Sequence, residues 1–428
     1  MRVTVLAAVL AAAFPGIAQA RWSHSFDFAP PGTLDVQGVR LALSPSGAAA
    51  AAFGIQDVDV PGSAQADVTL RSSQGTVGQP APVSGAAQIL AAAYDRGDLA
   101  LLTGTAGTGQ ICCSNAQATT VGADGRQSAP QTLVGGLAGP ALGQLVALAD
   151  GHVIAAVATE RGVWVMQAGS RGRFGAQHLL TLGGKMPETL AATRAGANGT
   201  VLAWTAATGI PGTADPRTIS VAEGVRGAAP RRVRTAITVP AGHRVDELGI
   251  AARGATETLT WIESWFDRSG AYHAVVRAAD LVPHAATRTL SPGGSVAAGL
   301  QFAGDPTGDQ TIVWQSCASS GACAVRMASR TAHGTFGGSR VLGAADPTQA
   351  PALAVGTGGQ ALAGWTLGGH PTVAVRRGAS GRFGSAVKLS PTLYAHDVAV
   401  AVGTRGRALA GWTQGTLNPS VVGALYTP

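Results

Sequence analysis

Residues 358–369, "GGQALAGWTLGG", are nearly repeated by residues 405–416, "RGRALAGWTQGT". The tryptophans of the two stretches, Trp365 and Trp412, lie 47 residues apart. Three more copies lie upstream, "NGTVLAWT", "TETLTWIE" and "GDQTIVWQ", and they carry Trp204, Trp261 and Trp314. A short pattern that recurs at a nearly constant distance indicates an internal repeat, which has to be recognised before a fold is inferred.

Weaker copies extend the series toward the N-terminus, with Val157, Thr103 and Phe53 at the tryptophan position. The spacings from Phe53 to Trp412 are 50, 54, 47, 57, 53, 51 and 47 residues. Eight copies with a period near 50 residues are typical of supersecondary units that stack on their neighbours.

Each unit has the composition of four short strands, most clearly in the seventh. Its segments are "PALAVGTGG", "QALAGWT", "PTVAVRRG" and "SGRFGSAVKLSP". Short alternating runs divided by Gly, Pro and Ser are strand and turn signals, and no segment after residue 20 sustains a helical period over three turns. The sequence therefore predicts an all-β fold, a β-propeller of eight four-stranded blades.

The two ends of the chain complement each other. The last unit stops one strand short, whereas residues 23–31, "SHSFDFAPP", resemble an outer strand in which Phe28 matches Leu389. We expect the N-terminal strand to complete the last blade and close the ring, which leaves no unpaired terminal edge. The alternatives are two smaller propellers, or a seven-bladed ring with one degenerate unit.

The repeated tryptophan has a structural interpretation. A large aromatic side chain at one place in each second strand fills the wedge between blades, and burying one indole is worth about 4–6 kcal/mol as an upper bound. The functional alternative is a ring of tryptophans that grips sugars. Repetition at one strand position, flanked by Ala and Thr, favours packing.

Composition argues against nucleic-acid binding. The net charge is +7, but only 12% of residues are charged, and the arginines are scattered except in the run 231–234.

The stretch 1–20 has a positive start, an apolar run and a small-x-small end, which predicts a secretory signal peptide, with an uncleaved anchor as the alternative. We expect a single domain over residues 21–428, secreted or at the cell surface, monomeric, without a membrane span and without a cofactor.

The richest cluster of functional side chains lies between the second and third strands of the fifth unit, in "IESWFDRSGAYH". It holds Glu263, Trp265, Asp267, Arg268 and Tyr272. Because Trp265 lies four residues beyond the packing tryptophan, the wedge does not explain it, and we predict a binding site for a glycan or a peptide. The alternative is that these side chains cap their own loop.

The four cysteines fit an exported chain. Cys317 and Cys323 flank a short loop between two predicted antiparallel strands, so we expect a disulfide worth about 2–2.5 kcal/mol. Cys112 and Cys113 are adjacent and would then form a vicinal disulfide. Pairing across the propeller is the alternative, which the distance between the second and sixth blades disfavours. The spacing does not suit a zinc site.

The turn after the third strand recurs as "QAGSRGRFGAQHLL", "SRTAHGTFGGSRVL" and "RRGASGRFGSAVKL". It resembles a degenerate form of the bacterial neuraminidase repeat, the Asp-box of sialidase-like propellers. Gly172, Gly334 and Gly381 match the motif glycine, and phenylalanines replace its tryptophan. The resemblance implies a carboxylate-binding role for Arg40 and Arg244, which lie at or just before first strands. A third arginine and a Tyr–Glu pair have no match.

Asp246 and Asp397 precede first strands at equivalent places, in "HRVDELGIA" and "YAHDVAVAV". They suit a carboxylate pair or a cation site at the channel mouth, or simply the cap of a turn. We therefore expect a binding or scaffold protein that uses the face with the longest loops, for an unidentified protein or glycan ligand. The alternative is a sialidase-like glycoside hydrolase, or another carbohydrate-active enzyme, with a diverged site.

Overall fold

The structure is a computed structural model, and it describes residues 21–32, 35–56, 63–95, 97–105, 113–137, 142–169, 173–180, 186–207, 217–224, 228–253, 256–282, 285–376, 378, 382–416 and 418–428. The predicted signal peptide, residues 1–20, lies outside the described residues, as do Cys112, Gly172 and Gly381. None of the described segments forms a helix long and apolar enough to cross a membrane.

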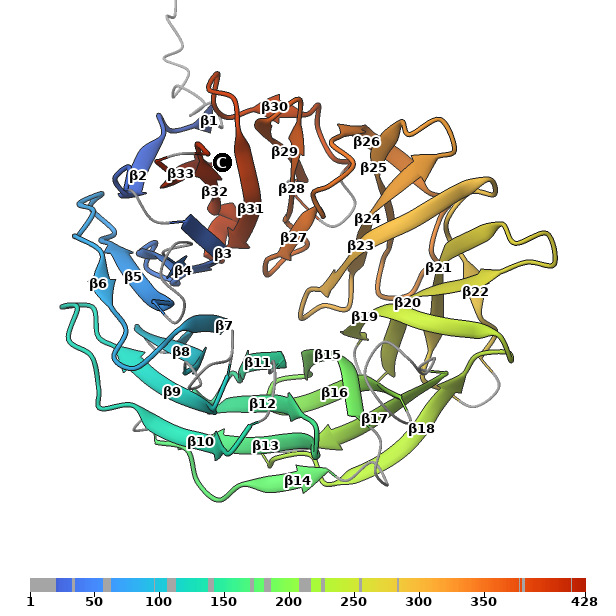
Figure 1. The fold of residues 1–428 in the computed structure, drawn as a ribbon, viewed down its shortest axis with the longest axis horizontal. Helices are drawn as coiled ribbons and strands as arrows, with labels where there is room; N and C mark the ends of the chain where they lie inside the picture. The colour runs from blue at the N-terminus through green and yellow to red at the C-terminus, as the bar shows by residue number, and fades with distance from the viewer. Residues whose placement is uncertain are drawn as a thin grey trace, which may run out of the picture.

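The strands form a ring of eight antiparallel sheets, each running from an inner strand to an outer strand (Figure 1). Blade one is β3 (Asp35–Leu43), β4 (Ala49–Gln56), β5 (Gln65–Arg71) and β6 (Ala81–Pro82); blade two is β7 (Gln88–Asp95), β8 (Asp98–Gly104), β9 (Asn115–Val121) and β10 (Gln131–Gly135). Blade three is β11 (Leu142–Ala147), β12 (Val153–Thr159), β13 (Gly162–Ala168) and β14 (His178–Leu180); blade four is β15 (Met186–Ala195), β16 (Gly199–Ala207), β17 (Thr218–Gly224) and β18 (Arg232–Thr238).

The second half continues the same order. Blade five is β19 (His243–Arg253), β20 (Thr256–Phe266), β21 (Tyr272–Asp280) and β22 (Arg288–Thr289); blade six is β23 (Ser295–Gly304), β24 (Gln310–Ala318), β25 (Cys323–Arg330) and β26 (Arg340–Ala345). Blade seven is β27 (Ala352–Val355), β28 (Ala361–Leu367), β29 (His370–Arg376) and β30 (Val387–Lys388). Blade eight has β31 (Ala395–Val402), the short 3-10 turn η1 (Thr404–Gly406), β32 (Ala408–Gln414) and β33 (Ser420–Thr427).

The N-terminal segment completes blade eight, as predicted. Two short strands, β1 (Arg21–Trp22) and β2 (Phe26–Ala29), both pair antiparallel with β33. Phe28 is buried in this blade and packs in one cluster with Phe53 of blade one. The first and last described strands therefore share one sheet, and the ring is closed by eight blades rather than by seven or by two smaller rings.

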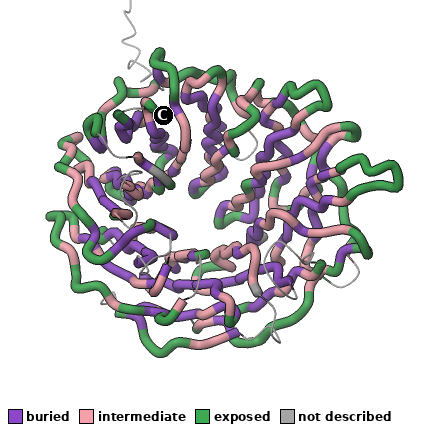
Figure 2. The backbone as a smooth tube through the Cα atoms, in the orientation of Figure 1, coloured by how far each residue is buried: buried purple, intermediate pink, exposed green. Residues whose placement is uncertain are grey.

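The repeated tryptophans are packing residues. All five are at most 1% exposed, and the residues that replace them in blades one to three are buried as well. Each contacts the preceding blade: Trp204 lies among residues of blade three, and Trp365 among residues of blade six. Figure 2 shows the same distribution, with buried backbone in the middle of the blades and exposed segments toward the outer rim. The aromatic series thus holds neighbouring blades together, and its rings are not accessible to sugars.

Inner strands carry a repeated irregularity. A β-bulge interrupts β3, β7, β15, β19, β23 and β31, each time in the first half of the strand. A side chain of the preceding blade braces some of these bulges: Glu247 Oε1 accepts the Gly299 N–H at 2.8 Å. Bulges re-aim side chains next to binding sites. They lie near the face where inner strands begin and second strands end, which we call the upper face.

Candidate functional site

The blade-five segment that we predicted to be an irregular loop is mostly strand. β20 extends to Phe266 and β21 begins at Tyr272, so only residues 267–271 form the turn. Asp267 holds this turn, because its Oδ1 accepts the N–H groups of Ser269 at 2.8 Å and Ala271 at 3.0 Å. The expected long loop is therefore a rigid hairpin that rises from the upper face. Asp267 caps its own turn, the alternative that the sequence left open.

Trp265 stands in a ladder of three stacked rings across the blade. His243 on β19 and His273 on β21 are its register partners on the two neighbouring strands. The His243 ring is 4.6 Å from the Trp265 ring at an interplanar angle of 9°, and the His273 ring is 5.1 Å away at 14°. Both faces of the indole are thus covered, and Trp265 is half-buried rather than fully exposed. It stiffens the hairpin and presents only an edge to solvent.

The Glu263 carboxylate lies below this ladder and is only 5% exposed. His243 Nδ1 is 2.7 Å from Glu263 Oε1, and Arg277 Nε is 3.3 Å from Oε2. The Trp261 indole N–H also points to Oε2, at 3.4 Å. A buried carboxylate needs such partners to remain charged. Glu263 is therefore a structural anchor of the histidine ladder.

Asp267 connects the ladder to the turn. Its Oδ2 lies 2.8 Å from His273 Nε2. The hydrogen bonds from the Ser269 hydroxyl, His273 and the turn amides favour the carboxylate form and hold the pKa of Asp267 well below its usual range. The Asp267 carboxylate is therefore ionised at neutral pH, and His273 keeps its acceptor.

The opposite side of the same hairpin presents aromatic rings to solvent. Phe266 and Tyr272 are register partners, their rings lie 5.3 Å apart at 51°, and they are 69% and 44% exposed. The Tyr272 hydroxyl donates to Asp246 Oδ2 at 3.4 Å, and Arg244 Nε is 2.5 Å from Asp246 Oδ1. Desolvation is the main cause that raises the pKa of Tyr272, so its hydroxyl remains a donor at neutral pH.

We call this surface the blade-five crest; it consists of Arg244, Asp246, Phe266, Arg268 and Tyr272. Arg268 occupies the turn, is exposed, and has no side-chain partner among the described residues. The crest thus joins five polar and aromatic groups that are separated by up to 28 residues in the chain. Four of these residues are candidates from the sequence pattern, and Phe266 is not, although strict alternation after Trp265 places it on the other side of the strand.

Arg40 and Asp397 lie elsewhere, in the central channel. They line one cavity of about 650 Å³ together with residues of the inner strands of blades one to four and six to eight. Desolvation lowers the pKa of Arg40, and the negative charge of Asp397 offsets part of this effect. The described lining of this cavity holds one arginine, Arg40, and one carboxylate, Asp397. Asp246 is paired with Arg244 and not with Arg40. The three converging arginines of a sialidase site are not present in that lining.

Asp246 and Asp397 do occupy the same structural position. Each stands in the bulge of its inner strand, between Val245 and Glu247 in β19 and between His396 and Ala399 in β31. Asp397 has a positive φ of 49°, a conformation that aspartate tolerates better than most residues. Asp246 is engaged by Arg244, whereas Asp397 lines the channel. The two aspartates thus have different surroundings, and a carboxylate pair at the channel mouth stays a prediction.

The cysteines agree with the sequence where the structure describes both partners. Cys317 and Cys323 form a disulfide across the β24–β25 hairpin, where they are direct register partners. Cys113 is buried, but its predicted partner Cys112 lies outside the described residues. The vicinal pairing stays a prediction.

The Asp-box-like turns lie on the lower face, opposite the crest. Their phenylalanines cap cations at the ends of third strands: the Arg330 guanidinium lies 4.6 Å from the Phe336 ring centre, and that of Arg376 lies 5.7 Å from Phe383. Arg330 is also bonded to Asp280 of blade five at 2.5 Å. The Arg330 ion pair therefore links blade six to blade five, whereas the Arg376–Phe383 contact lies within blade seven.

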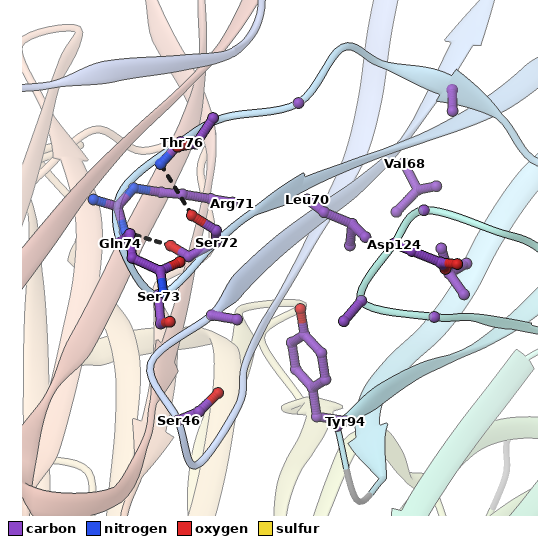
Figure 3. Close-up of a pocket in the computed structure, with 18 of the residues that line it drawn as sticks. Ser46, Val68, Leu70, Arg71, Ser72, Ser73, Gln74, Thr76, Tyr94 and Asp124 are labelled. Carbon is purple, nitrogen blue, oxygen red and sulfur yellow. Dashed lines mark hydrogen bonds between the residues drawn. The ribbon is translucent and has the colours of Figure 1, made fainter.

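A second cavity, of about 590 Å³, opens on the lower face between blades one and two. Figure 3 shows the Tyr94 ring rising between Ser46 and Asp124, with Leu70 and Val68 across from it. Arg71 points away from Tyr94 in the same view. Its guanidinium lies 4.9 Å from the centre of the Phe26 ring. The lining combines apolar side chains with hydroxyl groups, and its one arginine, Arg71, is directed away from Tyr94.

Comparison with known proteins gives the fold alone. No protein-family model matches the sequence. No curated protein matches it either. Among solved structures, the polysaccharide lyase Uly1 is similar at 8% identity and a TM-score of 0.48, over 79% of this chain and 89% of that one. A puromycin hydrolase is similar at 14% identity and a TM-score of 0.49, and the match covers 90% of this chain but only 58% of the hydrolase chain.

A sialidase, Hz136, is similar at 11% identity and a TM-score of 0.40, over 73% of each chain. Identities this low carry no information on reaction or substrate. The chain is a β-propeller, and it is similar in fold to a polysaccharide lyase, a puromycin hydrolase and a sialidase.

Proposed function

We propose that the protein is an exported binding protein whose blade-five crest recognises an oligosaccharide. The observation that carries this proposal is the exposed aromatic pair of Phe266 and Tyr272. The Tyr272 hydroxyl is held by Asp246, which is itself paired with Arg244. Aromatic rings provide large, stiff apolar surfaces, and neighbouring charged groups supply directional hydrogen bonds to hydroxyls. The Cys317–Cys323 disulfide is consistent with an oxidising compartment.

The crest suits a sugar better than a folded protein partner. Only two large apolar side chains, Phe266 and Tyr272, are exposed on the crest. The surface area that two side chains offer is far smaller than the area of about 1,000 Å² that a specific protein interface buries. Their rings are tilted by 51°, so together they form an angled platform rather than a groove. A single sugar ring can contact one aromatic face while its hydroxyls reach Arg244, Asp246 or the turn cation Arg268.

Preorganisation supports the same proposal. The hairpin is stiffened from behind by the ring ladder of His243, Trp265 and His273 and at its tip by the Asp267 cap. Side chains that are already held in place lose little entropy on binding. The crest therefore keeps its shape without ligand, as expected of a recognition surface on a rigid scaffold.

The alternative function, glycoside hydrolysis, needs two carboxyl groups about 5–9 Å apart on either side of a scissile bond. Glu263 and Asp246 lie on opposite sides of the blade-five sheet: Glu263 faces blade four with Trp261, whereas Asp246 bonds with Tyr272 on the side of blade six. Both are already paired with arginine. The other two carboxylates at this end are engaged as well, since Asp267 caps its own turn and Glu247 accepts the Gly299 N–H. This arrangement favours binding over turnover.

The test is a binding screen on immobilised neutral and acidic polysaccharides, with the wild type compared with a Phe266→Ala/Tyr272→Ala double variant. We expect at least one polysaccharide to bind the wild type and to bind the double variant about 10–100 times more weakly, since hot-spot aromatics contribute that much. Reducing-end release is measured on the same panel, because turnover would instead support the hydrolase alternative.

A matched control replaces two exposed apolar residues that lie away from the crest, Val282→Ala and Val341→Ala. These side chains are 46% and 54% exposed, so the variant changes exposed apolar area without touching blade five's upper end. If the control loses binding as strongly as the crest variant, or if neither loses it, the crest is not the binding surface.

A further inference from the structure

The central channel contains a second set of polar side chains, separate from the crest. Its cavity of about 650 Å³ lies within the range of small-molecule sites. Four glutamines from four different blades line it, Gln88, Gln144, Gln301 and Gln349. Blade five, which carries the crest, contributes none of the described lining residues, so the two sites are independent.

Arg40 is the one cation in the described lining of this cavity. Arg40 follows the bulge of β3. Its guanidinium donates a long hydrogen bond to the neighbouring Val39 carbonyl, at 3.4 Å. No carboxylate lies within ion-pair distance of it in the part of the chain that the structure describes. The forked guanidinium is thus left with donors that face the channel.

Asp397 is the one carboxylate in the described lining. Its backbone N–H donates to Gln349 Oε1 at 3.4 Å, but no described residue bonds to its side chain. Its left-handed backbone, with a φ of 49°, holds the residue in the bulge of β31. Backbone conformations of this kind in non-glycine residues are concentrated at ligand sites.

Opposite charges that share one cavity would ordinarily pair directly. Arg40 and Asp397 come from the adjacent blades one and eight and interact electrostatically, yet they form no hydrogen bond and no ion pair within 4.0 Å. The gap leaves a cationic and an anionic group facing the same space. A ligand with one charge of each sign satisfies both, whereas a simple anion or cation is attracted by one and repelled by the other.

We propose that the channel binds a small zwitterion, an amino acid or a short peptide, with its carboxylate on Arg40 and its ammonium group on Asp397. The guanidinium offers parallel N–H groups to a carboxylate, and the ammonium group donates to the Asp397 oxygens. The glutamine amides, which both donate and accept, bind the peptide groups between the two ends. The side chain of Gln301 has no hydrogen bond to another described residue and is available for this role.

The experiment uses three probes of nearly equal size: triglycine, N-acetyl-triglycine and triglycine amide. Acetylation removes the positive charge, and amidation removes the negative charge. Isothermal titration calorimetry of the full chain should show that triglycine binds at least about tenfold more tightly than either capped probe, the factor expected for one charge-assisted hydrogen-bonded contact.

Two variants assign each end. Asp397→Asn keeps the size and tolerates the left-handed backbone, and it should abolish the preference over N-acetyl-triglycine while the preference over the amide remains. Arg40→Gln should do the reverse. Arg232→Gln on the outer strand β18 is the matched control and should change neither preference, because Arg232 is exposed and does not line the channel. Unfolding midpoints of all three variants confirm that the ring is intact.

The result that overturns the proposal is the absence of triglycine binding at about 10 mM, where even a ligand with a Kd near 1 mM would be about nine-tenths bound. Equal binding of all three probes also overturns it, as does a variant pattern in which Asp397→Asn and Arg40→Gln act alike. None of these outcomes bears on the blade-five crest, because the crest residues do not line the channel.

Discussion

Trp365 and Trp412 occupy the same position in adjacent blades and are both fully buried, yet their indole N–H groups have different acceptors. Trp365 Nε1 donates to the Ala344 carbonyl of blade six at 2.9 Å, so this hydrogen bond crosses from one blade to the next. Trp412 Nε1 donates to Gln414 Oε1 of its own strand at 3.0 Å. Trp314, equally buried, has no partner for its indole N–H among the described residues.

This difference predicts unequal effects of one substitution. Tryptophan to phenylalanine removes the same indole atoms at positions 314 and 365, so the packing loss is similar. Trp365→Phe additionally leaves the Ala344 carbonyl without its donor and should cost about 0.5–1.5 kcal/mol more than Trp314→Phe. Denaturant unfolding of the two variants measures the difference. Equal destabilisation would mean that the interblade hydrogen bond adds nothing to packing.

The N-terminal segment that contains β1 and β2, which we call the N-terminal strap, should be essential to the stability of blade eight. Phe28 is 1% exposed, and Phe28→Ala should destabilise the protein by about 3–5 kcal/mol, as large core truncations do. A Cβ atom at Gly423 of β33 would lie 2.6 Å from the Phe28 ring, so Gly423→Ala should displace the same strap. Thermal unfolding detects both effects. A Phe28→Ala variant as stable as the wild type would show that the strap is not part of the closed ring.

The hairpin disulfide should stabilise by a modest amount. Cys317 and Cys323 close a small loop in blade six, and the chain-entropy model gives about 2 kcal/mol for a loop of that size. The double variant Cys317→Ser/Cys323→Ser should lower the free energy of unfolding by about this amount while the far-UV circular dichroism spectrum is retained. Loss of the folded spectrum would indicate that the disulfide is required for folding and not only stabilising.

Tyr94 predicts a loss of stability at alkaline pH. Desolvation in the lower-face cavity raises the pKa of Tyr94 to about 12, compared with about 10 for an unfolded chain. Since the folded-state pKa is raised, this contribution to stability is complete below about pH 10 and is lost as the pH rises toward 12. Tyr94→Phe should therefore show a shallower alkaline loss of stability, measured by unfolding between pH 9 and 12. Parallel curves for the two proteins would contradict the burial of this phenol.

Architecture could be predicted from the sequence because it rests on a repeated residue. Trp365 recurs in equivalent strands, and period-2 alternation around it fixes which side of each strand is buried. The same logic identified the missing outer strand, through the match of Phe28 with Leu389. A repeat of eight units overdetermines the fold, so a few degenerate copies such as Thr103 do not obscure it.

The site was only partly predictable because its geometry depends on register between strands. The sequence predicts a surface position for Trp265, but strand pairing determines its stacking partners, His243 and His273. Likewise Arg40 and Asp397 are 357 residues apart, and only ring closure brings blades one and eight together. A single sequence contains no signal for which loop residues face one another across such distances.

Hydrogen–deuterium exchange tests the central claim most directly, with the polysaccharide that binds best in the screen. We predict that the ligand slows exchange of the backbone amides of residues 264–273, the hairpin that carries Phe266 and Tyr272, and that the Phe266→Ala/Tyr272→Ala variant shows no such protection. Protection confined to another surface, or no protection at saturating ligand, would contradict the assignment of the blade-five crest as the binding surface.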